Sequence, residues 1–225
     1  MVQIQVGPPI NKEKFVRDQF WGSEEEKGEV IKKVMSPMEK SNDDGADFNQ
    51  VDSSGNRIYF YSGVSRPKVL KLNKMIFNLN ANLAPKAEMY ECGKPVIKLH
   101  INSYGGSVFA GLSAVDHIIN SPLPVHSIID GCAASAATLM SVVADKRYIQ
   151  KNACMLVHQL SGVMWGKYAA MKDDMENSKM LMKKIKDIYR KYTKIPESKL
   201  DDILKHDLWW DAEKCLEYGL VDEII

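Results

Sequence analysis

The chain falls into two parts that differ in the spacing of their hydrophobic and polar residues. Residues 1–56 have few regularly spaced apolar positions and include the charged run Ser23–Lys27 and the polar stretch Ser41–Gly45. Such a composition favours flexible chain with local structure. A helix over residues 12–35 is an alternative, although its apolar positions repeat poorly. We therefore expect a variable N-terminal arm over residues 1–56 and a single folded domain over residues 57–225.

From residue 57 onward, short apolar runs alternate with helical patterns and with glycine-containing turns. Runs rich in β-branched and aromatic residues predict strands, and apolar residues three or four apart predict helices. This alternation indicates an α/β fold with a mainly parallel sheet and helices around it. The predicted strands are 58–61, 95–101, 125–129, 146–149, 153–158 and 221–225, and the predicted shorter helices are 69–79, 107–120, 133–143 and 213–220.

A much longer helix is predicted over about residues 166–192, where it would be roughly 40 Å long at 1.5 Å per residue. Its apolar and small residues form a heptad seam, with alternating steps of four and three. The seam suits a helix that protrudes and pairs with a second chain, and equally a helix packed within its own domain. The seam residues are Met171, Met175, Ser178, Met182, Ile185, Tyr189 and Tyr192.

The composition is that of an ordinary globular protein. Of the 225 residues, 45% are hydrophobic and 26% are charged, and the net charge of +1 provides no strong field for nucleic acid or a membrane surface. The start of the chain lacks the apolar core of a secretory signal, and the uncharged stretch Gly131–Ala144 is too short to span a bilayer. We expect a cytoplasmic protein, without nucleic-acid or membrane partners.

Neither metal nor nucleotide chemistry has a motif in this sequence. There is no HExxH pattern, no CxxC pair, no GxGxxG and no P-loop. The four cysteines lie far apart, and buried free thiols are the usual interpretation of such cysteines. We expect no metal ion and no cofactor bound by this chain.

One serine lies where a nucleophile could lie. Ser135 follows a strand and a glycine turn and opens a small-residue helix, where unpaired N–H groups gather. A serine among alanines more often reflects close packing. The turn Gly105-Gly106 follows the predicted strand 95–101. It lies at the carboxyl end of that strand, the sheet edge where ligands bind in open α/β sheets. The N–H groups of Gly106 and Ala136 could together form an oxyanion hole.

A serine nucleophile requires a base and a group that orients the base. The chain has five histidines, and their chemistry alone does not choose among them. His158 ends an apolar strand, which suits projection into a cleft, although a satisfied core histidine is the commoner case. Asp207 is an attractive orienting group because it directly precedes the apolar run Leu208–Trp210.

Five ordered segments together resemble the proteolytic subunit of Clp protease over about residues 58–225. The segment NSYGGS resembles the N-S-P-G-G-x turn of that family, GCAAS resembles G-x-A-A-S-M-G-A, and LVHQ resembles M-I-H-Q-P. Near the C-terminus, DLWWDA resembles D-x-[FY]-[LM]-[ST]-A, and EYGLVD matches E-Y-G-L-[VI]-D. The segments are Asn102–Ser107, Gly131–Ser135, Leu156–Gln159, Asp207–Ala212 and Glu217–Asp222.

The resemblance implies a serine endopeptidase with a Ser–His–Asp triad. Ser135 would attack a peptide carbonyl, His158 would transfer the proton, and Asp207 would hold the imidazole tautomer. The N–H groups of Gly106 and Ala136 would receive the oxyanion.

The resemblance also implies where substrate binds and how subunits assemble. Substrate would lie as a strand between an edge formed by Gly106, Ser107 and Val108 and a segment formed by Leu160, Ser161 and Gly162.

The fold would be a ClpP/crotonase-like superhelix of strand–turn–helix units, with the long helix as a protruding handle between two stacked seven-membered rings. Unfolded polypeptides would be the substrates, in protein quality control, and a partner AAA+ unfoldase would use the ATP. The N-terminal arm would be a propeptide or line the axial entrance.

The chain departs from the family pattern in ways typical of a divergent member, such as one encoded by a virus and acting in the host cytoplasm. Tyr104 replaces the usual proline, Ala136–Thr138 replaces Met-Gly-Ala, and residues 84–93 form an expected loop insertion. The arm is longer than the usual propeptide. The region where the family docks its ATPase is expected to be less apolar here, with Lys98, His100, Asn120 and Tyr148.

Two other functions remain as alternatives. One is a ring subunit that has lost activity and serves assembly or regulation, which the presence of all three triad residues disfavours. The other is a crotonase-type acyl-CoA enzyme, a related fold with a similar oxyanion hole. Such an enzyme requires an acidic base near the hole, and no such residue is apparent.

Overall fold

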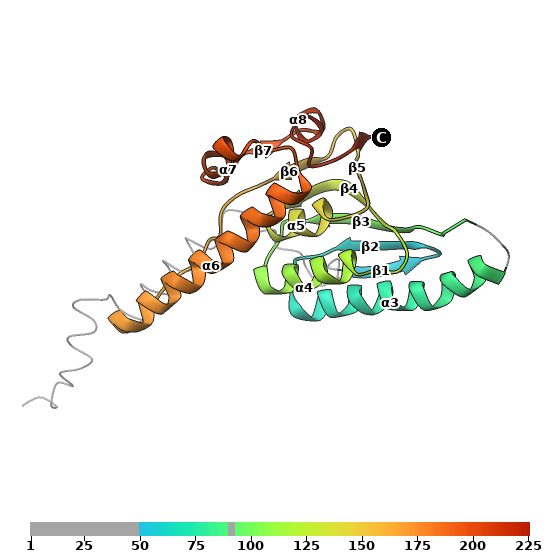
Figure 1. Ribbon diagram of the computed structural model, residues 1–225, viewed down its shortest axis with the longest axis horizontal. Helices are drawn as coiled ribbons and strands as arrows, with labels where there is room; N and C mark the ends of the chain where they lie inside the picture. The colour runs from blue at the N-terminus through green and yellow to red at the C-terminus, as the bar shows by residue number, and fades with distance from the viewer. Residues whose placement is uncertain (1–49, 90–92) are drawn as a thin grey trace, which may run out of the picture. The chain divides into compact units, whose positions relative to one another are not determined.

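The structure, a computed structural model, describes residues 50–89 and 93–225. Within these residues an eight-stranded sheet has the strand order β1-β2-β3-β4-β5-β8, with β6 beside β4 and β7 beside β6 (Figure 1). The pairs β1–β2 and β6–β7 are antiparallel and all the others are parallel, which confirms the mainly parallel sheet. The strands are β1 Gln50–Ser54, β2 Arg57–Tyr61, β3 Ile97–Ser103, β4 Val125–Ala134, β5 Lys146–Ile149, β6 Cys154–Leu156, β7 Trp209–Trp210 and β8 Glu223–Ile224.

Helices pack on the sheet through the alternate residues of its strands. On β2 and β3, Ile58, Phe60, Leu99 and Ile101 are fully buried, as expected for the inward face of a strand with a period of two. Helices α3 and α4 lie side by side over this sheet, and α5 packs between α4 and the strands (Figure 1). The helices are α3 Arg66–Met89, α4 Val108–Ile119, α5 Ala136–Val142, α6 Tyr168–Tyr192, α7 Glu197–Leu204 and α8 Ala212–Glu217.

The folded domain begins earlier than the expected boundary between residues 56 and 57. That boundary falls inside the β1–β2 hairpin, because β1 pairs with β2 across a turn in which Gly55 has a φ of 60°. Strand β1 has a single buried apolar residue, Val51, so its sequence does not have the pattern of a strand. The helix considered over residues 12–35 lies outside the described residues.

Helix α3 is longer than expected, and the loop expected from residue 84 is helical as far as Met89. The helix includes Pro85, although proline lacks an N–H and usually ends a helix. Leu79, Leu83 and Ala84 pack against the core before the proline, and the helix continues from there to Met89.

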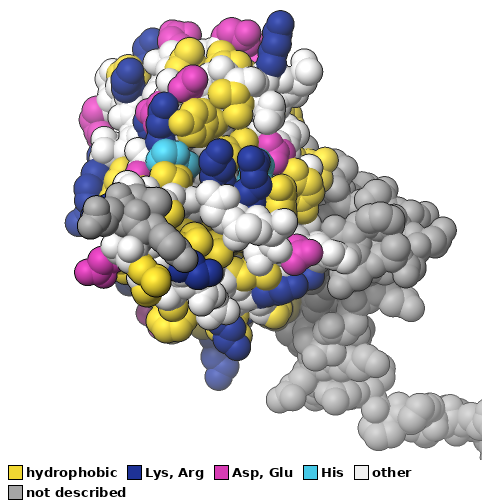
Figure 2. All heavy atoms as spheres, turned by 90° about the vertical axis from the view of Figure 1, so that its right-hand side faces the viewer, with side chains coloured by type: hydrophobic (Ala, Val, Ile, Leu, Met, Phe, Trp, Pro, Cys, Tyr) yellow, Lys and Arg dark blue, Asp and Glu magenta, His cyan; other side chains and the backbone are white. Residues whose placement is uncertain are grey.

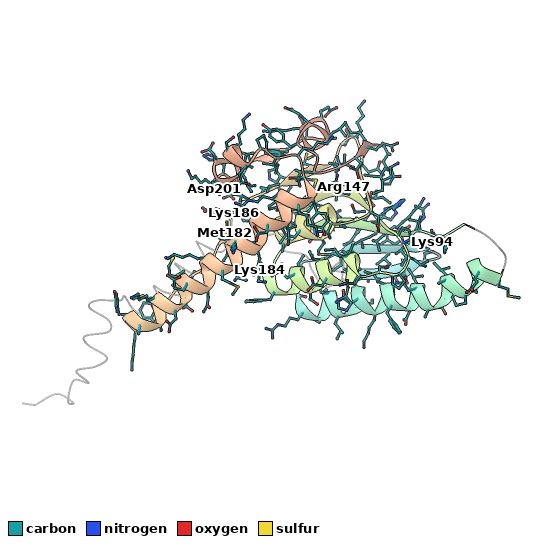
Figure 3. The ribbon with its side chains drawn as sticks, viewed as in Figure 1. Lys94, Arg147, Met182, Lys184, Lys186 and Asp201 are labelled. Carbon is teal, nitrogen blue, oxygen red and sulfur yellow. The ribbon has the colours of Figure 1, made fainter. Side chains whose placement is uncertain are left out.

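Two other segments differ from their sequence patterns. Residues 197–204, where no helix was predicted, form helix α7. It buries Leu200 and Leu204 and is joined to α6 by an ion pair of 2.5 Å between Lys186 Nζ and Asp201 Oδ1 (Figure 3). The helix expected from residue 133 begins only at Ala136, because β4 continues past its glycine to pair with β6.

The two halves of α6 have different surroundings. In the second half, Leu181, Ile185 and Tyr189 are buried against the same domain. In the first half, Met175 and Met180 are 47% and 45% exposed, and this end of the helix extends away from the sheet (Figure 1). The alternative of a helix packed within its own domain therefore holds for the second half, and pairing with a second chain stays a prediction.

Charges of both signs are distributed over the surface. On the face shown in Figure 2, Lys and Arg side chains are interspersed with acidic, hydrophobic and uncharged ones. None of the helices in the described part of the chain is both long enough and apolar enough to cross a membrane.

A half-buried arginine joins the C-terminal segments to the sheet. Arg147 on β5 donates through Nη1 to the carbonyl oxygens of Tyr192 and Gly219, the latter at 2.8 Å. Its Nε and Nη2 donate to the Asp222 carboxylate at 3.0 and 2.5 Å. These hydrogen bonds hold the pKa of Asp222 below its ordinary value.

We expect Arg147→Met to lower the free energy of unfolding by about 2 kcal/mol, because it leaves two carbonyls and a carboxylate without their donor. The lowered pKa of Asp222 means that its contribution is complete above its ordinary pKa of about 4 and is lost as pH falls through the folded-state value. The deficit should therefore shrink below about pH 4. Urea unfolding followed by tryptophan fluorescence measures both effects.

The matched control is Lys146→Met on the same strand, whose ion pair with Glu223 is about half exposed on both sides. Exposed pairs of this kind contribute at most about 1 kcal/mol. Equal losses for the two variants would contradict a special role for Arg147.

Candidate active site

Ser135 lies between the end of β4 and the start of α5, in a backbone conformation that few residues adopt. Its φ of 55° and ψ of −126° make it the single non-glycine residue with a positive φ among those the structure describes. Such a conformation costs about 1–3 kcal/mol and persists only where the surroundings fix it. Ser135 N donates to Leu156 O at 2.9 Å, which holds the serine beside β6. The strain sets a defined orientation for the side chain.

His158 and Asp207 come together beside the end of β6. Nδ1 of His158 lies 2.9 Å from Oδ1 of Asp207, with the side chains 19% and 76% exposed. Two contacts position the loop that carries Asp207. Gln159 N donates to Leu204 O at 2.7 Å, and β7 pairs with β6 immediately after the loop. The imidazole is thus held between a carboxylate on one side and the serine cavity on the other.

The serine and the histidine line one cavity of about 270 Å³. The lining of the cavity also includes both residues of the expected oxyanion hole. All the residues expected to contact substrate line it except Gly162. Asp207 contacts His158 without lining the cavity. The wall of the cavity also includes four residues that the sequence did not indicate as site residues. The lining residues are Gly106, Ser107, Val108, Ser135, Ala136, Leu139, His158, Gln159, Leu160, Ser161, Ile185 and Tyr189.

The backbone N–H of Gly106 is not used in the bridge to the neighbouring segment. Val64 uses both of its backbone groups on the neighbouring residues, donating to Gly105 O at 2.7 Å and accepting from Ser107 N at 2.8 Å. In a parallel bridge of this kind, the N–H of the residue between them points away from its partner. Gly106 therefore directs its N–H away from Val64, and it lines the same cavity as Ser135 and Ala136.

The second half of α6 contacts the segment that carries the serine. Tyr189 is 1% exposed, and its hydroxyl lies 2.6 Å from Thr138 Oγ1, which donates to Ser135 O at 2.6 Å. Met182 Sδ accepts a hydrogen bond from Leu160 N at 3.1 Å, which holds the expected substrate segment (Figure 3). Sequence reasoning placed Tyr189 in the seam, but its contact with the serine loop depends on tertiary packing.

Ser135 Oγ is not hydrogen-bonded to His158 within the described part of the chain. Catalytic hydrogen bonds are often long or poorly aligned in proteins without substrate and tighten when substrate binds. The described ranges contain no group of three or more His, Cys, Asp or Glu side chains placed to hold a metal ion.

A second histidine–carboxylate pair lies outside the cavity. His100 Nδ1 on β3 is 2.6 Å from Asp130 Oδ2 on β4, and Tyr61 OH donates to the same oxygen at 2.9 Å. Burial and the bond to Asp130 raise the pKa of Tyr61 to about 12. This cluster joins three strands of the sheet. Since His158 and not His100 lines the cavity with Ser135, it is the histidine available as a base.

The loop that carries Asp207 also rests on an aromatic contact. The rings of Tyr104 and Trp209 meet edge to face with centroids 6.3 Å apart. If Asp207 orients the base as expected, Trp209→Ala should lower kcat roughly three- to tenfold with little change in KM, because an aromatic pair contributes about 0.5–1.5 kcal/mol.

The control is Trp209→Phe, which keeps a ring against Tyr104 and should restore most of kcat. Steady-state kinetics of the three proteins measures the effect on kcat and on KM separately. A change confined to thermal stability, with normal kinetics, would contradict a positioning role.

Comparisons with known proteins define the class. A family model described as Clp protease matches residues 88–225, which is more than half of the chain. The chain therefore belongs to the Clp protease family.

Two curated relatives are named as proteolytic subunits. The ATP-dependent Clp protease proteolytic subunit of Deinococcus radiodurans is 31% identical over 131 residues, covering 57% of this chain and 64% of that protein. The ATP-dependent Clp protease proteolytic subunit 1 of Streptomyces avermitilis is 37% identical over 131 residues, covering 57% of this chain and 60% of that protein. The chain thus spans less than two thirds of the length of these relatives.

The fold has a close counterpart among solved structures. A ClpP1 mutant from Listeria monocytogenes superposes with a TM-score of 0.66 at 21% identity, covering 76% of this chain and 91% of that chain. This likeness confirms the expected α/β fold class.

Proposed function

We propose that the chain is a serine endopeptidase that hydrolyses peptide bonds through Ser135, His158 and Asp207. The observation that carries the proposal is the convergence of three features on one cavity. These are a strained serine, a histidine paired with a carboxylate at 2.9 Å, and a glycine N–H directed away from its strand partner. Acyl transfer through a triad uses these three kinds of group.

In the proposed reaction, Ser135 Oγ attacks the carbonyl carbon while His158 Nε2 accepts its proton. The developing oxyanion lies between the N–H groups of Gly106 and Ala136. Collapse of the tetrahedral intermediate breaks the C–N bond, and His158 donates the proton to the departing amine. Water then attacks the acyl-enzyme with His158 again as base. Asp207 keeps Nδ1 protonated and stabilises the imidazolium.

The proposed substrate is an extended polypeptide. The bridge between Val64 and Gly106 leaves the cavity side of the glycine turn unpaired, so a peptide could add there as a strand. Ser107 and Val108 would form one side of the channel, and Leu160, Ser161 and Gly162 the other. A channel that binds the substrate through its backbone suits unfolded chains, because it contacts few of their side chains.

The proposed active form is a ring assembly of this chain, with the first half of α6 as a contact between rings. The exposed Met175 and Met180 give that half an apolar surface without a partner in the described part of the domain. The proposal includes two stacked heptamers and an AAA+ partner that uses ATP, while the chain itself binds no cofactor.

The test of this function compares two substrates. Purified full-length chain is incubated with a fluorogenic peptide and, separately, with an acyl-CoA thioester. We expect peptide turnover and no thioester turnover. Thioester turnover alone would replace the proposal with a crotonase-type enzyme, and a ring by native mass spectrometry with neither activity would replace it with an inactive assembly subunit.

A further inference from the structure

Two cysteines lie opposite each other in the register of the strands that lead to the candidate serine and histidine. Cys132 on β4 and Cys154 on β6 are direct partners in the parallel register, and both are half-buried. Paired residues on neighbouring strands point to the same side of the sheet. Burial raises the pKa of Cys132, and the neighbouring Cys154 raises it further.

The spacing of neighbouring strands is compatible with a disulfide, but only under strain. Strands lie about 4.7–4.9 Å apart, within the Cα separation that disulfides span. The Cβ atoms of a disulfide lie about 3.8 Å apart, so β4 and β6 must approach each other by roughly 1 Å. Cys132 Sγ now donates to Asn102 Oδ1 at 3.4 Å on the opposite neighbour, β3, so its side chain must also turn toward Cys154.

We propose that Cys132 and Cys154 are a reversible oxidation site, at which a peroxide forms a disulfide that slows the proposed peptidase. One thiolate attacks hydrogen peroxide and becomes a sulfenic acid, with release of one water after protonation. The second thiol then attacks that sulfur, the S–S bond forms, and a second water leaves. Two thiols and one peroxide thus give one disulfide and two waters, and a dithiol reductant reverses the change.

The effect on the site follows from how close the pair lies to it. Ser135 is three residues beyond Cys132, and His158 is four residues beyond Cys154. The hydrogen bond from Ser135 N to Leu156 O joins the same two strands at the site itself. A misplacement of about 1 Å can cost about 100-fold in rate, so the oxidised form should be roughly 10- to 100-fold slower. Strained and accessible disulfides are the ones that reductants readily open.

The third described cysteine provides a contrast. Cys215 is fully buried, its thiol lies 3.6 Å from Trp210 O, and burial raises its pKa to about 12. It should stay reduced under conditions that oxidise the pair. Because burial also raises the pKa of Cys132, the reaction is best run at pH 8.5, where more thiolate is present.

The experiment uses full-length chain carrying Cys92→Ser, so that a cysteine outside the described residues does not interfere. The protein is treated with hydrogen peroxide at pH 8.5, quenched with N-ethylmaleimide and digested, and cross-linked peptides are identified by mass spectrometry. We expect a Cys132–Cys154 cross-link that dithiothreitol removes, together with a reversible loss of peptide hydrolysis. Absence of the cross-link, with both thiols maleimide-labelled, would overturn the proposal.

Two matched variants separate the disulfide from general oxidation. Cys132→Ser and Cys154→Ser should each keep their activity in peroxide, whereas Cys215→Ser should lose activity as the parent does. Equal peroxide sensitivity in all variants would overturn the proposal. The proposal rests on the proposed peptidase function, yet the cross-link is read by mass, so a reduced protein without activity would count against the function and not against the disulfide.

Discussion

Ser135→Ala is expected to lower the turnover of a fluorogenic peptide by roughly four to six orders of magnitude while leaving the fold intact. Loss of a triad nucleophile has effects of this size because the remaining groups lose the atom on which they act. The serine side chain forms no hydrogen bond that holds the domain together within the described residues; its carbonyl and N–H make the structural contacts. Alanine must still adopt the strained backbone, so stability should change little.

The losses of turnover in variants of the three expected triad residues should also follow a defined order. His158→Ala should lose about as much as Ser135→Ala, since both remove the proton-transfer pair. Asp207→Asn should lose less than the roughly 10⁴-fold seen where such a carboxylate is buried, because the Asp207 side chain is 76% exposed. Peptide turnover within a few-fold of the parent in Ser135→Ala would contradict the assignment of the nucleophile.

Gly105→Ala is expected to lower activity by about 100-fold or more and to destabilise the fold as well. A Cβ on Gly105 would lie 2.6 Å from Ser135 Cβ and 2.6 Å from Ala134 O, closer than carbon atoms tolerate. The φ of 92° adds strain for any residue with a Cβ. The serine loop must therefore shift, and shifts of about 1 Å in a reacting group have costs of this order.

The control is Gly63→Ala on the facing segment. Its Cβ would have Gly105 O as nearest neighbour at 3.7 Å, an ordinary contact, and its φ lies outside the left-handed region. This variant should stay within a few-fold of the parent in turnover. Peptide turnover and thermal unfolding are measured for the two variants and the parent. Normal turnover in Gly105→Ala would show that the glycine turn does not shape the site.

The sequence predicted those elements whose pattern is local. The strands near residues 58, 97, 125 and 146 and the long helix near residue 168 all appear where their apolar periodicity indicated. Elements held by tertiary contacts were missed. Strand β1 depends on pairing with β2, and helix α7 depends on burying Leu200 and Leu204 and on its ion pair with α6.

The candidate site was only partly accessible to sequence reasoning for the same reason. The residue types around Ser135 suggested a nucleophile, but the choice of His158 and Asp207 relied on a family resemblance. Their proximity depends on contacts between segments about 45 residues apart, such as Gln159 N to Leu204 O. The support from Tyr189 through Thr138 and the pairing of the two cysteines likewise follow from packing and strand register, which no local pattern encodes.

The most direct test of the proposed nucleophile is intact mass measurement after treatment with a fluorophosphonate probe. This probe reacts with a serine only where a base and an oxyanion hole activate it. The proposal predicts one adduct per chain, located at Ser135 by peptide mapping, absent from Ser135→Ala and strongly slowed in His158→Ala. An unmodified parent protein, or an adduct that persists in Ser135→Ala, would contradict it.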